Sequence, residues 1–137
     1  MMNAFLYENH VITKIVLAIH VPAGSGSAVH KNRPSHGIAL NCAGEKVYTF
    51  SDGKKYVVKK NDFIYLPKNT TYTVATTHPG DTYCINFQCE SGAFDPFVFP
   101  LKNAEEAIQA YKNAERAWRH KKDGYELLCK AELLARL

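Results

Sequence analysis

The sequence has 137 residues, 46% of them hydrophobic and 12% aromatic, with a formal net charge of +4. This length and composition predict one folded domain with a real core and an appendage, and they argue against a disordered chain. No apolar run approaches the ~20 residues of a transmembrane helix. The positive charge is mild, and part of it falls at 116–122, where cations suit a helix end better than a nucleic-acid surface.

The cysteines form no C-x-x-C pair. They are Cys42, Cys84, Cys89 and Cys129. Scattered thiols in a domain of this size are typical of buried structural cysteines in a reducing compartment, and a disulfide or a sensor thiol is the less favoured alternative. The first residues also lack the basic and apolar segments of a signal peptide. We therefore expect a cytoplasmic protein.

The first predicted strand is the β-branched run at 11–21, which follows a short arm at 1–9. Residues 22–35, rich in Gly, Ser and Pro, predict an irregular loop. Arg33 stands in this loop before a proline, which holds it extended. Its guanidinium is either a solvated charge or a clamp for a carboxylate, a phosphate or a sugar hydroxyl. The next strand is predicted at 36–42.

Residues 47–75 predict four short antiparallel strands in succession, which together form one wall of a small barrel or jelly roll. The Asp-Gly pair at 52–53 is typical of a type I′ hairpin turn, in which both central residues have φ > 0. The Pro-x-Asn sequence at 67–69 predicts another tight turn, because proline removes a ladder donor and asparagine tolerates a left-handed backbone. A turn at 77–81 follows.

The last predicted barrel strand, 82–89, alternates between two faces. One face carries Tyr83, Ile85 and Phe87, and the more polar face carries Thr82, Cys84 and Asn86. The more polar face is the one that would line a cavity inside the barrel. Residues 91–101, with two prolines, predict an apolar linker strapped across the barrel.

Beyond this linker the hydrophobic period becomes helical. A helix is predicted over 103–122, with Asn103 as its N-cap and two glutamates in its first turn. A second helix, 125–137, follows an Asp-Gly break. The apolar stripes of both helices need a cover, which is either the barrel or a second subunit. If a second subunit provides the cover, the dimerisation residues would be Tyr111, Trp118, Leu127 and Leu134.

These elements divide the chain into a barrel with its N-terminal arm, 1–100, and a helical dimerisation segment, 101–137. The apolar periodicity of the second predicted helix extends to Leu137, and no helix-stop signal follows it. The pattern therefore favours a native chain that continues beyond this residue, with a natural end as the alternative.

Two spacings along the chain resemble the sequence motifs of cupins. The second cupin motif, Gly-x5-Pro-x-Gly-x2-His-x3-Asn, falls on Asn61, Pro67, Asn69, Tyr72 and Thr76. The first, Gly-x5-His-x-His-x4-Glu-x6-Gly, falls on Gly24, His30, Asn32, Gly37 and Gly44. Asparagine is the natural substitute for a motif glycine at φ > 0. The resemblance implies a mainly β fold, a cupin-type double-stranded β-helix (jelly-roll) barrel followed by two C-terminal α-helices.

The metal-binding positions of cupins carry different chemistry in this sequence. They are His30, Asn32, Gly37 and Tyr72, of which only the histidine is a good transition-metal ligand. We therefore expect no metal and no cofactor.

The order of the patterns resembles the N-terminal effector-binding and dimerisation domain of AraC-type transcription regulators. Asn-Arg-Pro at 32–34 with H-G-I-A-L-N-C resembles the opening of that domain, 48–74 resembles its core of strands and turns, and Y-C-I-N-F-Q resembles its closing strand. Two helices after the barrel are also typical. The resemblance covers roughly residues 10–137.

This resemblance implies a bacterial regulator domain, not an enzyme, that binds a small effector inside the barrel, with sugars as one candidate class. Arg33 matches the arginine that contacts sugar in sugar-binding members of the family. The matched cavity-lining positions are Tyr72, Val74, Thr82 and Cys84. Ordinary core filling is the alternative for the aromatic side chains. The helices would form a homodimer, and DNA would be bound only by a helix-turn-helix module outside these 137 residues.

Two other functions stay open at this stage. A metal-dependent cupin oxygenase or isomerase needs about three protein ligands and an open coordination site. The histidines that could cluster are His20, His30, His36 and His78, but no H-x-H pair and no glutamate stand at the motif positions. A stand-alone structural or carbohydrate-binding cupin is the other alternative.

Overall fold

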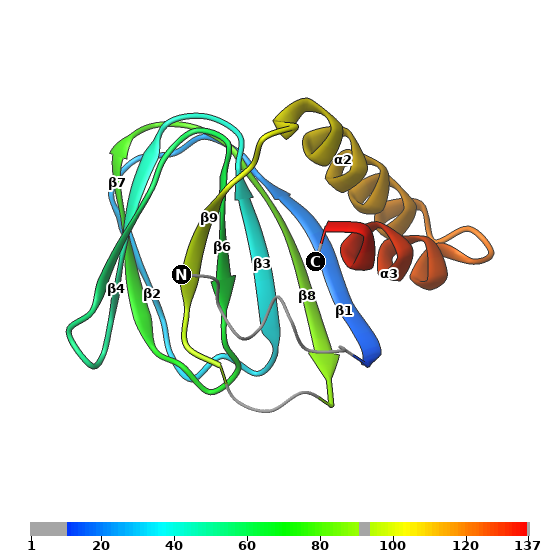
Figure 1. Cartoon of the computed structure of the whole chain (residues 1–137), viewed down its shortest axis with the longest axis horizontal. Coiled ribbons are helices and arrows are strands. Elements are labelled where there is room, and N and C mark those ends of the chain that lie inside the picture. The colour runs from blue at the N-terminus through cyan, green and yellow to red at the C-terminus, as the bar shows by residue number, and fades with distance from the viewer. Residues whose placement is uncertain (1–10, 91–93, 137) are drawn as a thin grey trace.

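The computed structural model describes residues 11–90 and 94–136, and Figure 1 shows strands followed by helices. The strands are β1 (Ile12–Val21), β2 (Ser27–His30), β3 (His36–Asn41), β4 (Glu45–Phe50), β5 (Lys55–Val58), β6 (Asp62–Leu66), β7 (Tyr72–His78), β8 (Thr82–Cys89) and β9 (Phe97–Pro100). The helices are α2 (Ala104–His120) and α3 (Tyr125–Arg136). The predicted mainly β fold with two C-terminal helices is therefore confirmed.

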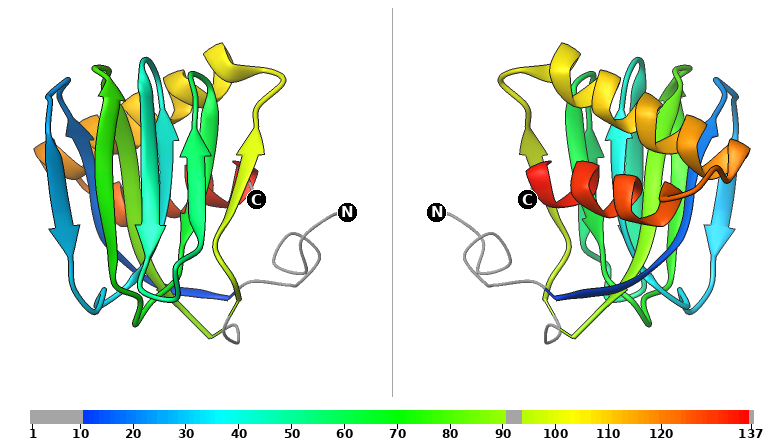
Figure 2. Two further views of the ribbon diagram at one scale, coloured as in Figure 1. Left: turned by 90° about the vertical axis from the view of Figure 1, so that its left-hand side faces the viewer. Right: turned by 90° about the vertical axis from the view of Figure 1, so that its right-hand side faces the viewer.

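Two antiparallel sheets face each other, and the helices cover only one of them. The five-stranded sheet has the order β1-β8-β3-β6-β9, and the four-stranded sheet has the order β2-β7-β4-β5. Figure 2 shows α2 and α3 lying across the outer face of the five-stranded sheet. The molecule thus has three layers and two interfaces between layers, one from sheet to sheet and one from sheet to helix.

The five-stranded sheet is buried on both faces because its central strands are apolar at odd and at even positions. In β3, Ile38 and Leu40 belong to the core under the helices, whereas Ala39 belongs to the core between the sheets. Strand β6 divides in the same way, with Tyr65 toward the helices and Ile64 toward the other sheet. The predicted alternation of β8 is confirmed, since Ile85 and Phe87 pack in the helix-side core.

Three predictions about the strands are wrong. Strands β4 to β7 do not form one wall, because β6 pairs with β3 and β9 in the other sheet. The predicted loop 22–35 contains β2, which pairs with β7, and the predicted linker 91–101 ends in β9. Both missed strands have four residues and lie at sheet edges, so their strand state comes from pairing with a neighbour more than from their own sequence.

The structure confirms some of the predicted turn conformations and contradicts one of them. Asn61 and Asn69 have φ values of 69° and 66°, as their match to motif glycines predicted. The type I′ prediction for 52–53 is wrong: of these two residues, only Gly53 has a positive φ, and its N–H donates to the Phe50 carbonyl at 2.9 Å. Asn103 occupies the N-cap position of α2, but its side chain makes no capping hydrogen bond.

The predicted arm at 1–9 lies outside the described residues. Neither of the two described helices has the length and apolar content needed to cross a bilayer.

Asn69 gives a test of the turn that follows β6. We expect Asn69→Ala to lower the free energy of unfolding by about 1–2 kcal/mol, because a Cβ without a local hydrogen-bonding group is strained at φ 66°. Asn69→Gly is the matched control and should stay close to wild type. Urea denaturation measures both variants, and equal stabilities for them would contradict the left-handed turn.

Candidate functional site

A cavity of about 340 Å³ lies between the two sheets. Its wall includes every predicted ligand-binding residue, namely Arg33, Tyr72, Val74, Thr82 and Cys84. These residues come from the 31–35 loop, β7 and β8, which the fold brings to one interior. The geometry therefore places the predicted set together, and its role in ligand binding remains a prediction.

The backbone of Arg33 is fixed by the turn that follows β6. The Arg33 N–H donates to the Thr70 carbonyl at 2.9 Å, and the Asn69 N–H donates to the Arg33 carbonyl at 2.8 Å. This pair of hydrogen bonds ties the loop before β3 to the loop before β7. Arg33, whose backbone these two hydrogen bonds hold, is only 8% exposed.

Three hydrogen bonds hold the Arg33 guanidinium. Its Nε donates to the Ser35 carbonyl at 3.1 Å, Nη1 to the Tyr72 hydroxyl at 2.8 Å, and Nη2 to Asn86 Oδ1 at 2.6 Å. A guanidinium has five N–H donors, so one N–H remains on each terminal nitrogen for a ligand.

Gly37 makes room for this guanidinium. A Cβ at this position would lie 2.5 Å from Arg33 Nη2 and 2.7 Å from Asn86 Oδ1. Real Cβ atoms do not approach other heavy atoms so closely, so any larger residue would displace the arginine or the asparagine. The glycine is thus part of the site although it offers no functional group.

The charge of Arg33 has no acidic partner in the described part of the chain. No carboxylate there lies within 4.0 Å of its nitrogens, and the cavity wall contains no Asp or Glu. Arginine stays protonated in proteins. The interior therefore holds a permanent positive charge balanced only by neutral dipoles, which is costly unless an anion binds.

The other titratable groups around Arg33 stay neutral at pH 7. Burial, and then the Arg33 charge, lower the pKa of His30 below its usual value. Burial raises the pKa of Tyr72, against the opposing effect of Arg33. Burial also raises the pKa of the Cys84 thiol to about 11, although Arg33 opposes this shift. The thiol is therefore a poor nucleophile and acts as an apolar wall group.

The cupin-spaced positions meet around the guanidinium. The His30 ring stacks on Tyr72 with centroids 5.0 Å apart, and Tyr72 accepts the hydrogen bond from Arg33. Gly37 lies beneath Nη2, and Asn32 only donates its backbone N–H to Thr71 Oγ1. Within residues 11–90 and 94–136, no three His, Cys, Asp or Glu side chains form a group that could hold a metal ion. This donor set suits an anion better than a metal cation.

Lys46 and Asn41 are functional candidates that the sequence analysis missed. Lys46 is 9% exposed, and its Nζ donates to Asn41 Oδ1 at 2.6 Å and to the Gly80 carbonyl at 3.1 Å. Lys46 has the same phase in β4 as buried Tyr48 and Phe50, and this shared phase is the signal that could have revealed an inward lysine. The predicted strands begin at residue 47, so Lys46 falls outside this pattern.

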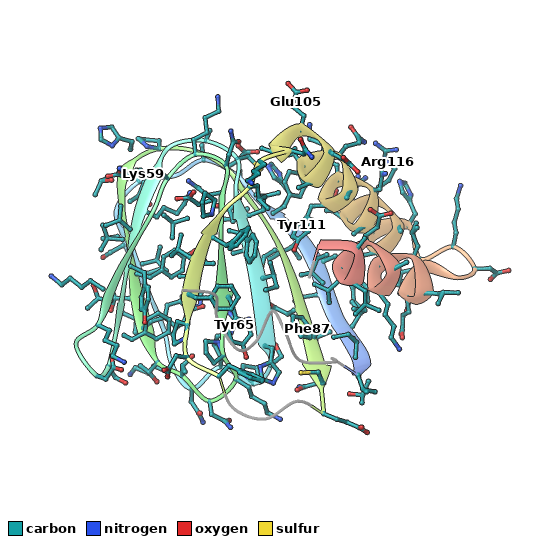
Figure 3. The ribbon with its side chains drawn as sticks, in the orientation of Figure 1. Lys59, Tyr65, Phe87, Glu105, Tyr111 and Arg116 are labelled. Carbon is teal, nitrogen blue, oxygen red and sulfur yellow. The ribbon has the colours of Figure 1, made fainter. Side chains whose placement is uncertain are left out.

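The predicted dimerisation residues lie in different surroundings. Tyr111 is 3% exposed and packs between α2 and the five-stranded sheet (Figure 3). Trp118 is partly buried, with Lys121 Nζ 3.5 Å from the centre of its ring. Leu127 and Leu134 on α3 are 71% and 41% exposed. Leu127 and Leu134 thus offer an open apolar surface, whereas the barrel already covers Tyr111.

No protein-family model and no curated protein matches the sequence. Solved structures do match it. ToxT from Vibrio cholerae, bound to an unsaturated fatty acid, has a TM-score of 0.57 at 8% identity, over 89% of this chain and 53% of that chain. A second ToxT structure has a TM-score of 0.54 at 9% identity, over 72% of this chain and 46% of that chain.

A DUF861 family protein from Thermotoga maritima has a TM-score of 0.42 at 19% identity, over 49% of this chain and 73% of that chain. ToxT is an AraC-family regulator, and the chain spans about half of its length. At these identities the likeness concerns the fold alone.

His30 reports on the charge of Arg33. We expect Arg33→Gln to raise the pKa of His30, because it removes the repulsion between two cations, while burial still keeps this pKa below its usual value. Lys31→Gln is the matched control, since the adjacent exposed lysine does not contribute to the shift. An NMR titration of the ring protons, assigned with His30→Gln, measures both variants. An unchanged pKa in Arg33→Gln would show that the guanidinium does not act on His30.

Proposed function

We propose that this chain is a ligand-sensing domain of an AraC-type transcription regulator, and that it binds a small molecule in the cavity between its sheets. The observation that carries this proposal is the buried guanidinium of Arg33, which has free N–H groups and no acidic partner in the described chain. A protein interior keeps such a charge when a ligand is to meet it.

The wall of the cavity suits such a ligand. Apolar groups surround the cationic end, among them Tyr48, Leu66 and Val74, and the polar groups are few and fixed in position. Binding sites for small molecules have this composition. The fold supports the same reading, since ToxT holds an unsaturated fatty acid, a long apolar chain with one carboxylate.

The two faces of β8 offer a route from the ligand to the helices. Cys84 and Asn86 line the cavity, whereas Ile85 and Phe87 pack in the core beneath the helices. A ligand that draws the guanidinium toward itself would shift Asn86 and hence the neighbours of Asn86 in the strand. Packed cores respond to such shifts by discrete rearrangement, so the position of α2 can depend on the ligand.

The proposed role is binding and not catalysis. The donor groups of the described residues do not assemble a metal site, and the thiol in the cavity is protonated at neutral pH. A metal-dependent cupin enzyme therefore gains no support from this geometry. In the proposed regulator, DNA contact belongs to a separate module and dimerisation belongs to the C-terminal helices.

A thermal-shift screen of small organic anions and sugars tests ligand binding. A molecule that binds only the folded state raises the melting temperature. We expect Arg33→Ala to weaken the binding of such a ligand at least ~10-fold while its circular dichroism stays native, because the ligand loses a charge-assisted hydrogen bond. Arg116→Ala, which removes an exposed arginine from α2, is the control. Unchanged affinity in Arg33→Ala would remove this arginine from the site.

The leucines of α3 test the proposed homodimer. We expect Leu134→Glu and Leu127→Glu to shift a dimer toward monomer in sedimentation velocity, because a charge on a buried apolar interface is costly. Lys112→Glu, an exposed charge reversal on α2, should leave the association unchanged. If both leucine variants remain dimeric, the interface does not include this face of α3.

A further inference from the structure

The cavity has a second buried cation at its other end. The Lys46 ammonium donates to Asn41 Oδ1 and to the Gly80 carbonyl, and Asn41 Oδ1 also accepts a hydrogen bond from Thr82 at 3.4 Å. An ammonium has three donors, so one N–H is left after these two bonds. Both Lys46 and Thr82 line the same cavity as Arg33.

Residue positions along two strands, β8 and β7, each give the distance between the two cations. Along β8, Asn86 contacts Arg33, and Thr82 belongs to the Lys46 cluster, four residues away. Along β7, Tyr72 contacts Arg33, and Thr76 is the register partner of Lys46, again four residues away. Four residues of strand span roughly 13 Å. The two positive groups therefore face the cavity from opposite ends.

The wall between the two cations is mainly apolar. Its members include Tyr48, Leu66, Val74 and Cys84. Burial raises the pKa of the Tyr48 hydroxyl, so this group stays neutral. A ligand that spans the cavity must then present an apolar middle between two polar ends.

The charges of the cavity wall do not balance. Lys46 has no ion pair within 4.0 Å in the described chain, and the wall lacks carboxylates. Burial lowers the pKa of Lys46, and Asp81 is the carboxylate that opposes this shift. Asp81 is outside the wall, and its carboxylate bonds to His20 Nε2 at 2.9 Å. Two cations without a counter-charge in the wall call for two negative charges from the ligand.

We infer that the cavity binds an elongated organic dianion, an aliphatic α,ω-dicarboxylate by chemical class, with one carboxylate on Arg33 and the other on Lys46. This inference rests on the proposed sensing function and specifies its ligand. The planar guanidinium offers parallel N–H donors to the first carboxylate. The ammonium, a compact point charge, meets the second one with its remaining donor.

Calorimetric titration with dicarboxylates of increasing length, succinate, adipate, suberate and sebacate, tests the two-ended ligand. The affinity should peak at one intermediate length, because only one chain length matches the fixed offset between the cations. Wild type should bind suberate at least ~10-fold more tightly than octanoate, which has the same carbon chain and only one carboxylate.

Lys46→Met isolates the second end of the site. This variant should lose at least ~10-fold of the suberate affinity and leave octanoate binding unchanged, because it keeps the length of the side chain and removes its charge. Lys55→Met, which removes an exposed lysine from β5 in the same sheet, should bind both ligands like wild type. If Lys46→Met does not fold, the wild-type comparison of suberate with octanoate decides alone.

Three results would contradict the inference of a dianionic ligand. They are equal affinities of wild type for suberate and octanoate, an equal loss of both affinities in Lys46→Met, and no binding of any dicarboxylate. If octanoate or another screened compound still binds through Arg33, the sensing function stands and only the dianion is wrong. If no compound of the wider thermal-shift screen binds either, the sensing function is wrong as well.

Discussion

The guanidinium of Arg33 is the point at which the two loops and the two sheets of this protein meet. Its backbone is clamped by the turn at 69–70, and its side chain bonds to Tyr72 in one sheet and to Asn86 in the other. Burying a charge is costly even when hydrogen bonds hold it in place. The retained charge is best understood through what it can attract into the cavity.

The five-stranded sheet makes such a cavity possible because one of its faces packs against the helices and the other faces the cavity. The helices bury one face with a continuous apolar core that includes Ile85, Phe87 and Tyr111. The stability gained there lets the opposite face remain partly open and polar, since folding does not depend on filling it. Strands β3, β6 and β8 therefore serve at once as the floor of a core and as the wall of a site.

The sequence predicted those elements that carry their own pattern. Strand β8 alternates visibly, α2 has a helical stripe, and Asn61 and Asn69 stand where a left-handed backbone is required. Strand β2 was missed because all four of its side chains are exposed, so only its pairing with β7 makes it a strand. In the site, Arg33 followed from family spacing, whereas Lys46 lies next to a turn and looks solvated until β4 places it inward.

The cupin-spaced positions of this chain surround a cation that belongs to the protein itself. Positions that surround a cation in metal-binding cupins here surround the guanidinium, with the Tyr72 hydroxyl as its acceptor and Gly37 as the space that admits it. A metal ion bound beside Arg33 would be repelled by this fixed charge, and the repulsion is strong where water is excluded. Burial, and then the charge of Arg33, lower the pKa of the neighbouring base His30. In the proposed site, the same framework would favour an anion, and Lys46 would extend that preference along the length of the cavity.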